Sequence, residues 1–324
     1  MVEIGFKLAS EVFGPHELIS YAKHAEDAGF DFASISDHYH PWLSQQGNSP
    51  FVWSTLGAIS QVTEDLNLMT GVTCPTIRQH PALVAQAVAT VATLIPGRFI
   101  LGVGSGENLN EHIYGDHWPS APIRIEMLAE AVDVIRTLWQ GGMQDYDGYY
   151  YHVENAQIYT LPEELPPIYM AADGPIAATT AANNGDGLIV SGGKKEILDI
   201  FNKTGGKGKP SYSETSLSWA ETDEKAVDLV YRWWPLMAIK GNISWDIPTQ
   251  THFEELVKNV KKEDIPEKIP CSSDPQVHMD KIKSNIDAGF DRICIQQIGN
   301  NQHEFIDFYK EEVLPEFQSG QKRL

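Results

Sequence analysis

Short apolar runs alternate with helix-length amphipathic segments along the chain. The same pattern recurs in residues 24–37 (HAEDAGFDFASISD), 181–190 (AANNGDGLIV) and 285–297 (NIDAGFDRICIQQ), where a glycine separates a predicted helix from an apolar strand. Glycine readily adopts the left-handed conformation that ends many helices, and we expect it at each of these positions. Repeated helix–glycine–strand units predict parallel strands joined by crossover helices.

The apolar runs predict about eight strands, several of them apolar almost throughout, which is typical of parallel strands buried on both faces. Helical patterns lie between them, for example Pro81–Leu94 and Pro122–Gln140. The predicted strands are Val2–Lys7, Phe32–Ser36, Asn67–Val72, Phe99–Gly104, Pro167–Ala172, Gly187–Val190, Thr215–Trp219 and Arg292–Gln297. Eight strands in 324 residues favour an α/β fold, a TIM (β/α)8 barrel with insertions, over an open sheet.

Two segments are longer than ordinary connections. Residues 141–166 contain a tyrosine-rich, hairpin-like piece (DYDGYYYHV), and residues 234–273 lie between the seventh and eighth predicted strands. Long insertions in a barrel often form lids or walls of the pocket. The sequence shows no linker and no low-complexity tract, so we expect one domain over residues 1–324.

Composition narrows the range of partners. The formal net charge is −20, so the surface repels phosphate backbones and we expect no nucleic-acid partner. The sequence has neither a signal-peptide pattern nor an apolar run long enough for a membrane span. The three cysteines have no CxxC spacing, which suits a reducing cytosol and predicts neither a disulfide framework nor a zinc site. These features predict a cytoplasmic protein that acts on a small molecule.

Polar and glycine-rich residues follow the predicted strands, where a barrel builds its active site. The second strand is followed by residues 37–42 (DHYHPW), the fourth by a GxGxGE segment, the fifth by Asp173, and the sixth by Ser191–Lys195. Some of these have simpler interpretations: Asp173 begins a helix as a cap would, and Lys194 suits a solvated helix start. His38 and His40 could bind zinc, but the fifth to eighth strand ends provide no further histidine, so we expect no metal site.

Four motifs occur in order along the chain: SDHYHPW, CPTIRQHPALVAQAVAT, PGRFILGVGSGENLNE and the GDG strand. With them the chain resembles, over nearly its whole length, the deazaflavin-dependent branch of the luciferase-like monooxygenase superfamily. That branch includes dehydrogenases of sugar phosphates and of secondary alcohols. The resemblance implies a TIM barrel, a homodimer, and hydride transfer between a C–OH group and coenzyme F420. The alternatives on the same barrel are an FMN-dependent monooxygenase and a non-catalytic flavin-binding relative.

The resemblance also implies residue roles. His38 would be the base that takes the hydroxyl proton, Glu107 would assist protonation of the deazaflavin ring, and Trp42 would line the reaction face. A cis peptide is implied between Gly71 and Val72. The positions that match coenzyme contacts are Asp37, Gly71, Val72, Cys74, Ser105, Gly106, Asn110, Asp173, Gly174, Ile176 and Ala177.

The resemblance implies the substrate-binding positions less completely. Glu11 matches a residue of the substrate pocket. In the sugar-phosphate enzymes four residues hold the phosphate; Ser191 and Lys194 match two of them, and Lys268 stands where those enzymes have arginine. Lys240 is a candidate for the remaining position. Replacing arginine by lysine removes a bidentate phosphate clamp, and the HYHPW and CPT details resemble the alcohol dehydrogenases. We expect a sugar phosphate or similar anionic polyol ahead of a neutral secondary alcohol.

Overall fold

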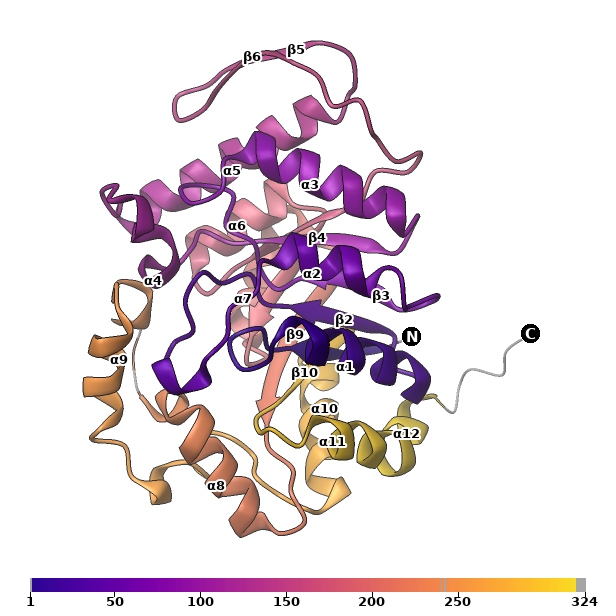
Figure 1. Ribbon diagram of the computed structural model, residues 1–324, viewed down its shortest axis with the longest axis vertical. Coiled ribbons are helices and arrows are strands. Elements are labelled where there is room, and N and C mark those ends of the chain that lie inside the picture. The colour runs from indigo at the N-terminus through magenta and orange to yellow at the C-terminus, as the bar shows by residue number, and fades with distance from the viewer. Residues whose placement is uncertain (1, 240, 242, 319–324) are drawn as a thin grey trace.

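The computed structural model describes residues 2–239, 241 and 243–318, and within them eight parallel strands close into a barrel. The order around the barrel is β1-β10-β9-β8-β7-β4-β3-β2, with helices on the outside (Figure 1). The barrel strands are β1 Glu3–Leu8, β2 Phe32–Ile35, β3 Asn67–Thr70, β4 Phe99–Val103, β7 Ile168–Ala171, β8 Gly187–Ser191, β9 Ser211–Leu217 and β10 Arg292–Gln297. The predicted TIM-barrel fold is therefore confirmed.

The seventh barrel strand differs most from its prediction. We predicted Thr215–Trp219, whereas β9 begins at Ser211 and ends at Leu217. The sequence SYSETSL does not read as a buried strand because most of its buried positions carry hydroxyl groups in place of a run of apolar side chains. The Ser213 hydroxyl, for example, donates to Asn285 Oδ1 over 2.6 Å. Buried polar side chains with hydrogen-bond partners lack the apolar signal by which strands are recognised.

Two of the three helices in the recurring pattern end at a left-handed glycine, as predicted, and the third does not. The helices are α1 Pro15–Ala28, α2 Val52–Ile59, α3 Pro81–Leu94, α4 Asn108–Glu111, α5 Ala121–Leu138, α6 Pro175–Asn184, α7 Lys195–Phe201, α8 Asp223–Trp233, α9 Gln250–Val257, α10 Pro275–Ala288, α11 Gln302–Phe308 and α12 Leu314–Gln318. Gly29 after α1 and Gly289 after α10 are left-handed, with φ of 94° and 105°. Gly185 after α6 is extended instead (φ −94°), so the expectation of a left-handed glycine there was wrong. Gly185 instead allows the backbone to pass close to the end of α6, because a Cβ at this position would come within 2.9 Å of the Ala181 carbonyl oxygen.

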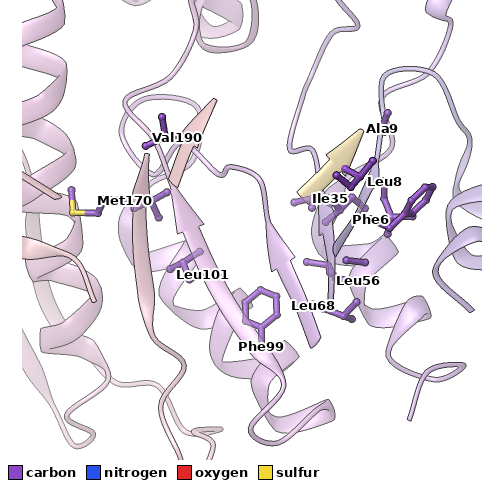
Figure 2. Packing of buried hydrophobic residues seen from close by; sticks show 14 of the residues in the cluster. Phe6, Leu8, Ala9, Ile35, Leu56, Leu68, Phe99, Leu101, Met170 and Val190 are labelled. Carbon is purple, nitrogen blue, oxygen red and sulfur yellow. The ribbon is translucent and has the colours of Figure 1, made fainter. Parts of the chain in front are cut away.

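The apolar core lies between the barrel wall and the surrounding helices. Figure 2 shows part of this layer, with strand residues such as Phe6, Leu68, Leu101 and Val190 together with Leu56 of α2. Each of these side chains is at most 1% exposed, so the layer contributes the hydrophobic stabilisation expected of a barrel. Within the described part of the chain, no helix combines the length and the apolar character that a bilayer span requires.

The predicted hairpin in residues 141–166 is formed by β5 Gln144–Asp147 and β6 His152–Ala156, and it projects beyond α5 (Figure 1). Glu130 of α5 accepts N–H groups from Tyr149, Tyr150 and Tyr151 at the hairpin turn, over 2.8–3.2 Å. No residue of this insertion is among the cavity-lining residues given below, so here the expected lid or pocket wall is not found.

Candidate active site

The ends of the barrel strands surround a cavity of about 590 Å³, within the usual size range of ligand pockets. The first turns of α5 and α6 and part of the segment after α8 complete its wall. Most of the predicted site residues line this one cavity: Glu11, Asp37, His38, Trp42, Gly71, Val72, Cys74, Ser105, Gly106, Glu107, Asn110, Asp173, Gly174, Ile176, Ala177 and Ser191. Lys194 and Lys268 are not among the lining residues, and Lys240 lies outside the described residues.

His38 lies between two carboxylates. Its Nε2 is 3.4 Å from Glu11 Oε1 and 3.6 Å from Glu107 Oε2. Glu11 is buried, and its second oxygen, Oε2, has no hydrogen-bond partner among the described residues. Trp42 packs beside the imidazole with a ring-centroid distance of 5.4 Å. Nε2 therefore faces both carboxyl groups on the wall of the cavity, where it can accept a proton from a bound hydroxyl group.

Asn110 fixes the other side of the imidazole. Its Oδ1 accepts the backbone N–H groups of Tyr39 (2.9 Å) and His40 (3.1 Å), which leaves its amide nitrogen facing Glu107 Oε2 at 3.2 Å and His38 Nδ1 at 3.1 Å. His38 Nδ1 also lies 3.1 Å from the carbonyl oxygen of His40, which can only accept. In the tautomer that carries its proton on Nδ1, this nitrogen donates to the carbonyl, the Asn110 amide donates to Glu107 alone, and Nε2 is the basic nitrogen. We refer to His38, Glu11, Glu107 and Asn110 as the His38 cluster.

Glu107 follows β4 and is positioned by the start of α4, where Asn110 N–H donates to its backbone carbonyl. Burial raises the pKa of the Glu107 carboxyl above its usual range, the nearby Glu11 adds to this rise, and His38 opposes it. A carboxyl whose pKa is raised in this way holds a proton closer to neutral pH than an exposed one, which suits a proton donor.

A second set of ionisable side chains, centred on Asp37 and Arg78, adjoins the His38 cluster and has more hydrogen bonds. The Asp37 carboxylate accepts from Arg78 Nη2 (2.9 Å), Gln79 Nε2 (2.7 Å) and Thr73 Oγ1 (2.8 Å). Glu111 accepts the Arg78 backbone N–H over 2.7 Å and lies 3.5 Å from Arg78 Nε. We call Arg78, Asp37, Glu111, Gln79 and Thr73 the Arg78 cluster. Its hydrogen bonds occupy the side chain of Asp37, which the resemblance assigns to the coenzyme.

Strand β3 is followed directly by the predicted cis peptide between Gly71 and Val72, which is confirmed. Gly71 has no room for a side chain, because a Cβ would come within 2.0 Å of Ser34 Oγ. Gly106 is left-handed, with φ of 83°, and its Cβ would meet Cys74 Sγ at 2.6 Å. Glycine at both positions therefore lets the backbone of this wall approach the cavity closely.

Lys7 and Glu214 form an ion pair that sequence reasoning missed. Both residues line the cavity, and Lys7 Nζ donates to Glu214 Oε2 over 2.7 Å and to the Gly71 carbonyl oxygen over 2.6 Å. Burial disfavours the charged form of Lys7, but nearby negative groups, chiefly Glu214, outweigh it and raise the pKa of Lys7. The signal in the sequence was a lysine among the apolar strand residues Ile4, Phe6 and Leu8. Arg78 was missed in the same way, although the CPTIRQ motif contains it.

The rim of the cavity lies after the neighbouring strands β7 and β8. Asp173 lines the cavity and pairs with Lys194, the N-terminal capping residue of α7. The insertion 234–273 contributes Trp234, Leu236, Met237, Ser244 and Trp245 to the wall, but Lys268 of the same insertion is exposed and lies outside the lining. The structure therefore brings one of the predicted phosphate-binding lysines to the rim, where it is already paired.

Comparisons with known proteins agree with this architecture. The family model described as luciferase-like monooxygenase matches residues 2–302. F420-dependent glucose-6-phosphate dehydrogenases from Microbacterium testaceum (strain StLB037) and Nocardia farcinica (strain IFM 10152) are 34% and 35% identical, each comparison covering 97% of both chains. A solved F420-dependent secondary alcohol dehydrogenase in complex with an F420-acetone adduct superposes with a TM-score of 0.89 at 28% identity, covering 97% of this chain and 98% of that one. The chain therefore belongs to the luciferase-like monooxygenase family.

Proposed function

We propose that this protein is an F420-dependent dehydrogenase that moves a hydride between a C–OH carbon of its substrate and the deazaflavin. The observation that carries the proposal is the His38 cluster, a basic nitrogen between two carboxylates on the wall of the cavity. The names of the similar proteins support the choice of coenzyme, because the two relatives and the solved structure described above are all F420-dependent enzymes.

The residues around the cavity fit such a coenzyme. Val72, Ala171 and Ile189 give part of the wall an apolar surface for a flat ring system, and a Cβ at Gly174 would meet no atom within 4 Å, so the rim there is open. The first turn of α6 carries the backbone N–H groups of Ile176 and Ala177, which have no partner one turn back, as at any helix start. Such groups favour an anion, and the coenzyme carries phosphate.

The protein's own part in the reaction is to move protons. In the direction of alcohol oxidation, His38 Nε2 takes the hydroxyl proton as the C–H bond breaks, and the Glu11 carboxylate stabilises the resulting imidazolium. Glu107, with its raised pKa, is the group placed to donate a proton towards the ring. Trp42 excludes water from one side of the imidazole. A bound deazaflavin supplies a carbon that accepts or returns the hydride and reacts poorly with oxygen.

The test is to offer F420 and FMN separately to the purified protein and to follow binding by fluorescence titration. We expect F420 to bind in the micromolar range or tighter, with FMN clearly weaker. The F420 complex should then be reduced without oxygen when alcohols or sugars are added. Equal binding of the two coenzymes, or oxygen-dependent turnover with reduced FMN, would contradict the proposal and favour a monooxygenase.

A further inference from the structure

Carboxylates dominate the charge around the cavity. The described lining residues include six carboxylates but only two permanently cationic side chains. The carboxylates belong to Glu11, Asp37, Glu107, Glu111, Asp173 and Glu214, and the cations to Lys7 and Arg124. An anionic substrate entering this cavity therefore meets an unfavourable field unless a cation is left without a carboxylate.

The cations at or next to the cavity already have partners in the described part of the chain. Lys7 is bound to Glu214 over 2.7 Å. Arg124 donates to the Pro119 carbonyl oxygen over 2.6 Å and lies 3.7 Å from an oxygen of Asp246. At the rim, Lys194 is bound to Asp173. Lys7 and Lys194 cannot bind a phosphate group without competition from their present carboxylates. Arg124 is 4% exposed, and its Nε has no hydrogen-bond partner among the described residues.

The pair at the rim follows from the barrel topology. Strands β7 and β8 are parallel neighbours, so the loops after them leave the same end of the barrel side by side. Asp173 lies two residues after β7, and Lys194 lies three residues after β8, beyond the left-handed glycines Gly192 and Gly193. The Asp173 carboxylate thus lies beside the Lys194 ammonium group and is paired with it.

We propose that Asp173 is a specificity-determining residue that neutralises Lys194 and closes the rim to phosphorylated substrates, so that the substrate is an uncharged alcohol or polyol. This inference rests on the proposed dehydrogenase function and narrows its substrate class. A phosphate reaching Lys194 would displace a carboxylate that stays covalently attached next to it, and the repulsion would persist in the complex. Our expectation from the sequence, a sugar phosphate held by Lys194 and Lys268, is replaced by this one.

The remaining rim residues suit an uncharged substrate. The wall contributed by the insertion 234–273 is mainly apolar and aromatic, with Trp234, Leu236, Met237 and Trp245, and Trp42 faces the cavity beside His38. Apolar walls with a few polar groups orient small neutral ligands, and they add nothing to the binding of a phosphate.

The experiment compares glucose 6-phosphate with 2-propanol as hydride donors to F420 and measures kcat/KM for each. We expect wild-type protein to favour 2-propanol by at least tenfold. In Asp173→Asn, the ratio of kcat/KM for glucose 6-phosphate to that for 2-propanol should rise at least tenfold, because Lys194 is freed. Adding Lys194→Ala to this variant should return the ratio towards the wild-type value. The exposed pair Lys195–Asp199 on the same helix gives the control, and Asp199→Asn should leave the ratio within twofold.

A readout that is independent of turnover uses inorganic phosphate as the probe. With F420 bound, so that the start of α6 is occupied, and at constant ionic strength, phosphate should raise the thermal midpoint of Asp173→Asn but not that of the wild type or of Asp173→Asn/Lys194→Ala. Wild-type preference for glucose 6-phosphate, or an unchanged ratio in a folded Asp173→Asn, would overturn the inference. If Asp173→Asn does not fold, the preference of the wild-type protein between 2-propanol and glucose 6-phosphate tests the inference alone. Failure to bind F420 would instead overturn the proposed function, so the two failures are distinguishable.

Discussion

The His38 cluster and the Arg78 cluster lie on the same side of the cavity, but they are bonded differently. In the Arg78 cluster, every oxygen of Asp37 and Glu111 accepts a hydrogen bond, and Arg78 joins the two carboxylates. In the His38 cluster, the histidine lies more than 3.3 Å from both carboxylates, and Glu11 Oε2 has no partner among the described residues. Fully satisfied networks stabilise a fold, whereas groups with unused bonding capacity remain available to a ligand.

The difference indicates which ionisable residues are structural and which are available for chemistry. Both clusters contain carboxyls whose pKa is raised mainly by burial, Glu107 in one and Glu111 in the other. A raised pKa alone does not separate them, since burial acts on both. The hydrogen-bond partners do, because both carboxylate oxygens of Glu111 are bonded to Arg78. Glu107 instead accepts one hydrogen bond, from Asn110, and faces His38 at 3.6 Å.

The largest effect on stability is expected in the Arg78 cluster. Arg78→Met leaves two buried carboxylates without their cation, and we expect the free energy of unfolding to fall by about 3–5 kcal/mol. Arg136 provides a matched control, because its 2.9 Å pair with Asp186 has side chains 38% and 47% exposed. Arg136→Met should cost at most about 1 kcal/mol. Urea denaturation measures the free energy of unfolding of both variants. If the two variants lost similar amounts, the buried Arg78 cluster would be no more important for stability than an exposed ion pair.

Glu107→Gln should affect turnover rather than folding. The variant keeps the shape of the side chain but cannot exchange a proton, so we expect kcat to fall about 10–100-fold, on the scale of general acid–base catalysis. Glu111→Gln alters the neighbouring network and should leave kcat within about threefold. Steady-state kinetics on F420-saturated enzyme, with urea denaturation as the folding control, measures the contrast. If Glu111→Gln slowed turnover as much as Glu107→Gln, the two clusters would not differ in function.

A smaller effect concerns pH. Burial raises the pKa of Glu111 from its ordinary value of 4.5 to about 7, with Arg78 opposing the rise. Between these pH values the folded protein holds a proton that the unfolded chain has lost, so stability falls as pH rises through this window and is level above it. We expect Glu111 to contribute at most about 3 kcal/mol of this fall, at about 1.4 kcal/mol for each pKa unit. Unfolding measured at pH 5 and pH 8 should show a smaller decline in Glu111→Gln than in wild type, and equal declines would assign the titration to other groups.

The sequence predicted the barrel because its strands are apolar and evenly separated by helices, and because Gly29 and Gly289 end two helices in the left-handed conformation. It missed the start of β9, whose buried hydroxyl groups resemble a surface segment. Most of the residues that the resemblance named line the cavity, but it named neither Lys7, which also lines the cavity, nor Arg78, which is bound to Asp37. These two depend on ion pairs with Glu214, Asp37 and Glu111, which lie far away in the sequence. The single domain, the homodimer and the cytoplasmic location stay predictions.

The most direct test of the central claim is single-turnover reduction of F420 by wild-type protein and by His38→Ala, mixed with saturating alcohol in the absence of oxygen. If His38 accepts the hydroxyl proton, the variant should bind F420 with an affinity within a few-fold of wild type. It should also reduce F420 at least about 10²-fold more slowly, the scale expected for loss of a general base. A folded His38→Ala protein that reduces F420 at near wild-type rates would show that the histidine between Glu11 and Glu107 is not the proton acceptor, and the account of this site would be wrong.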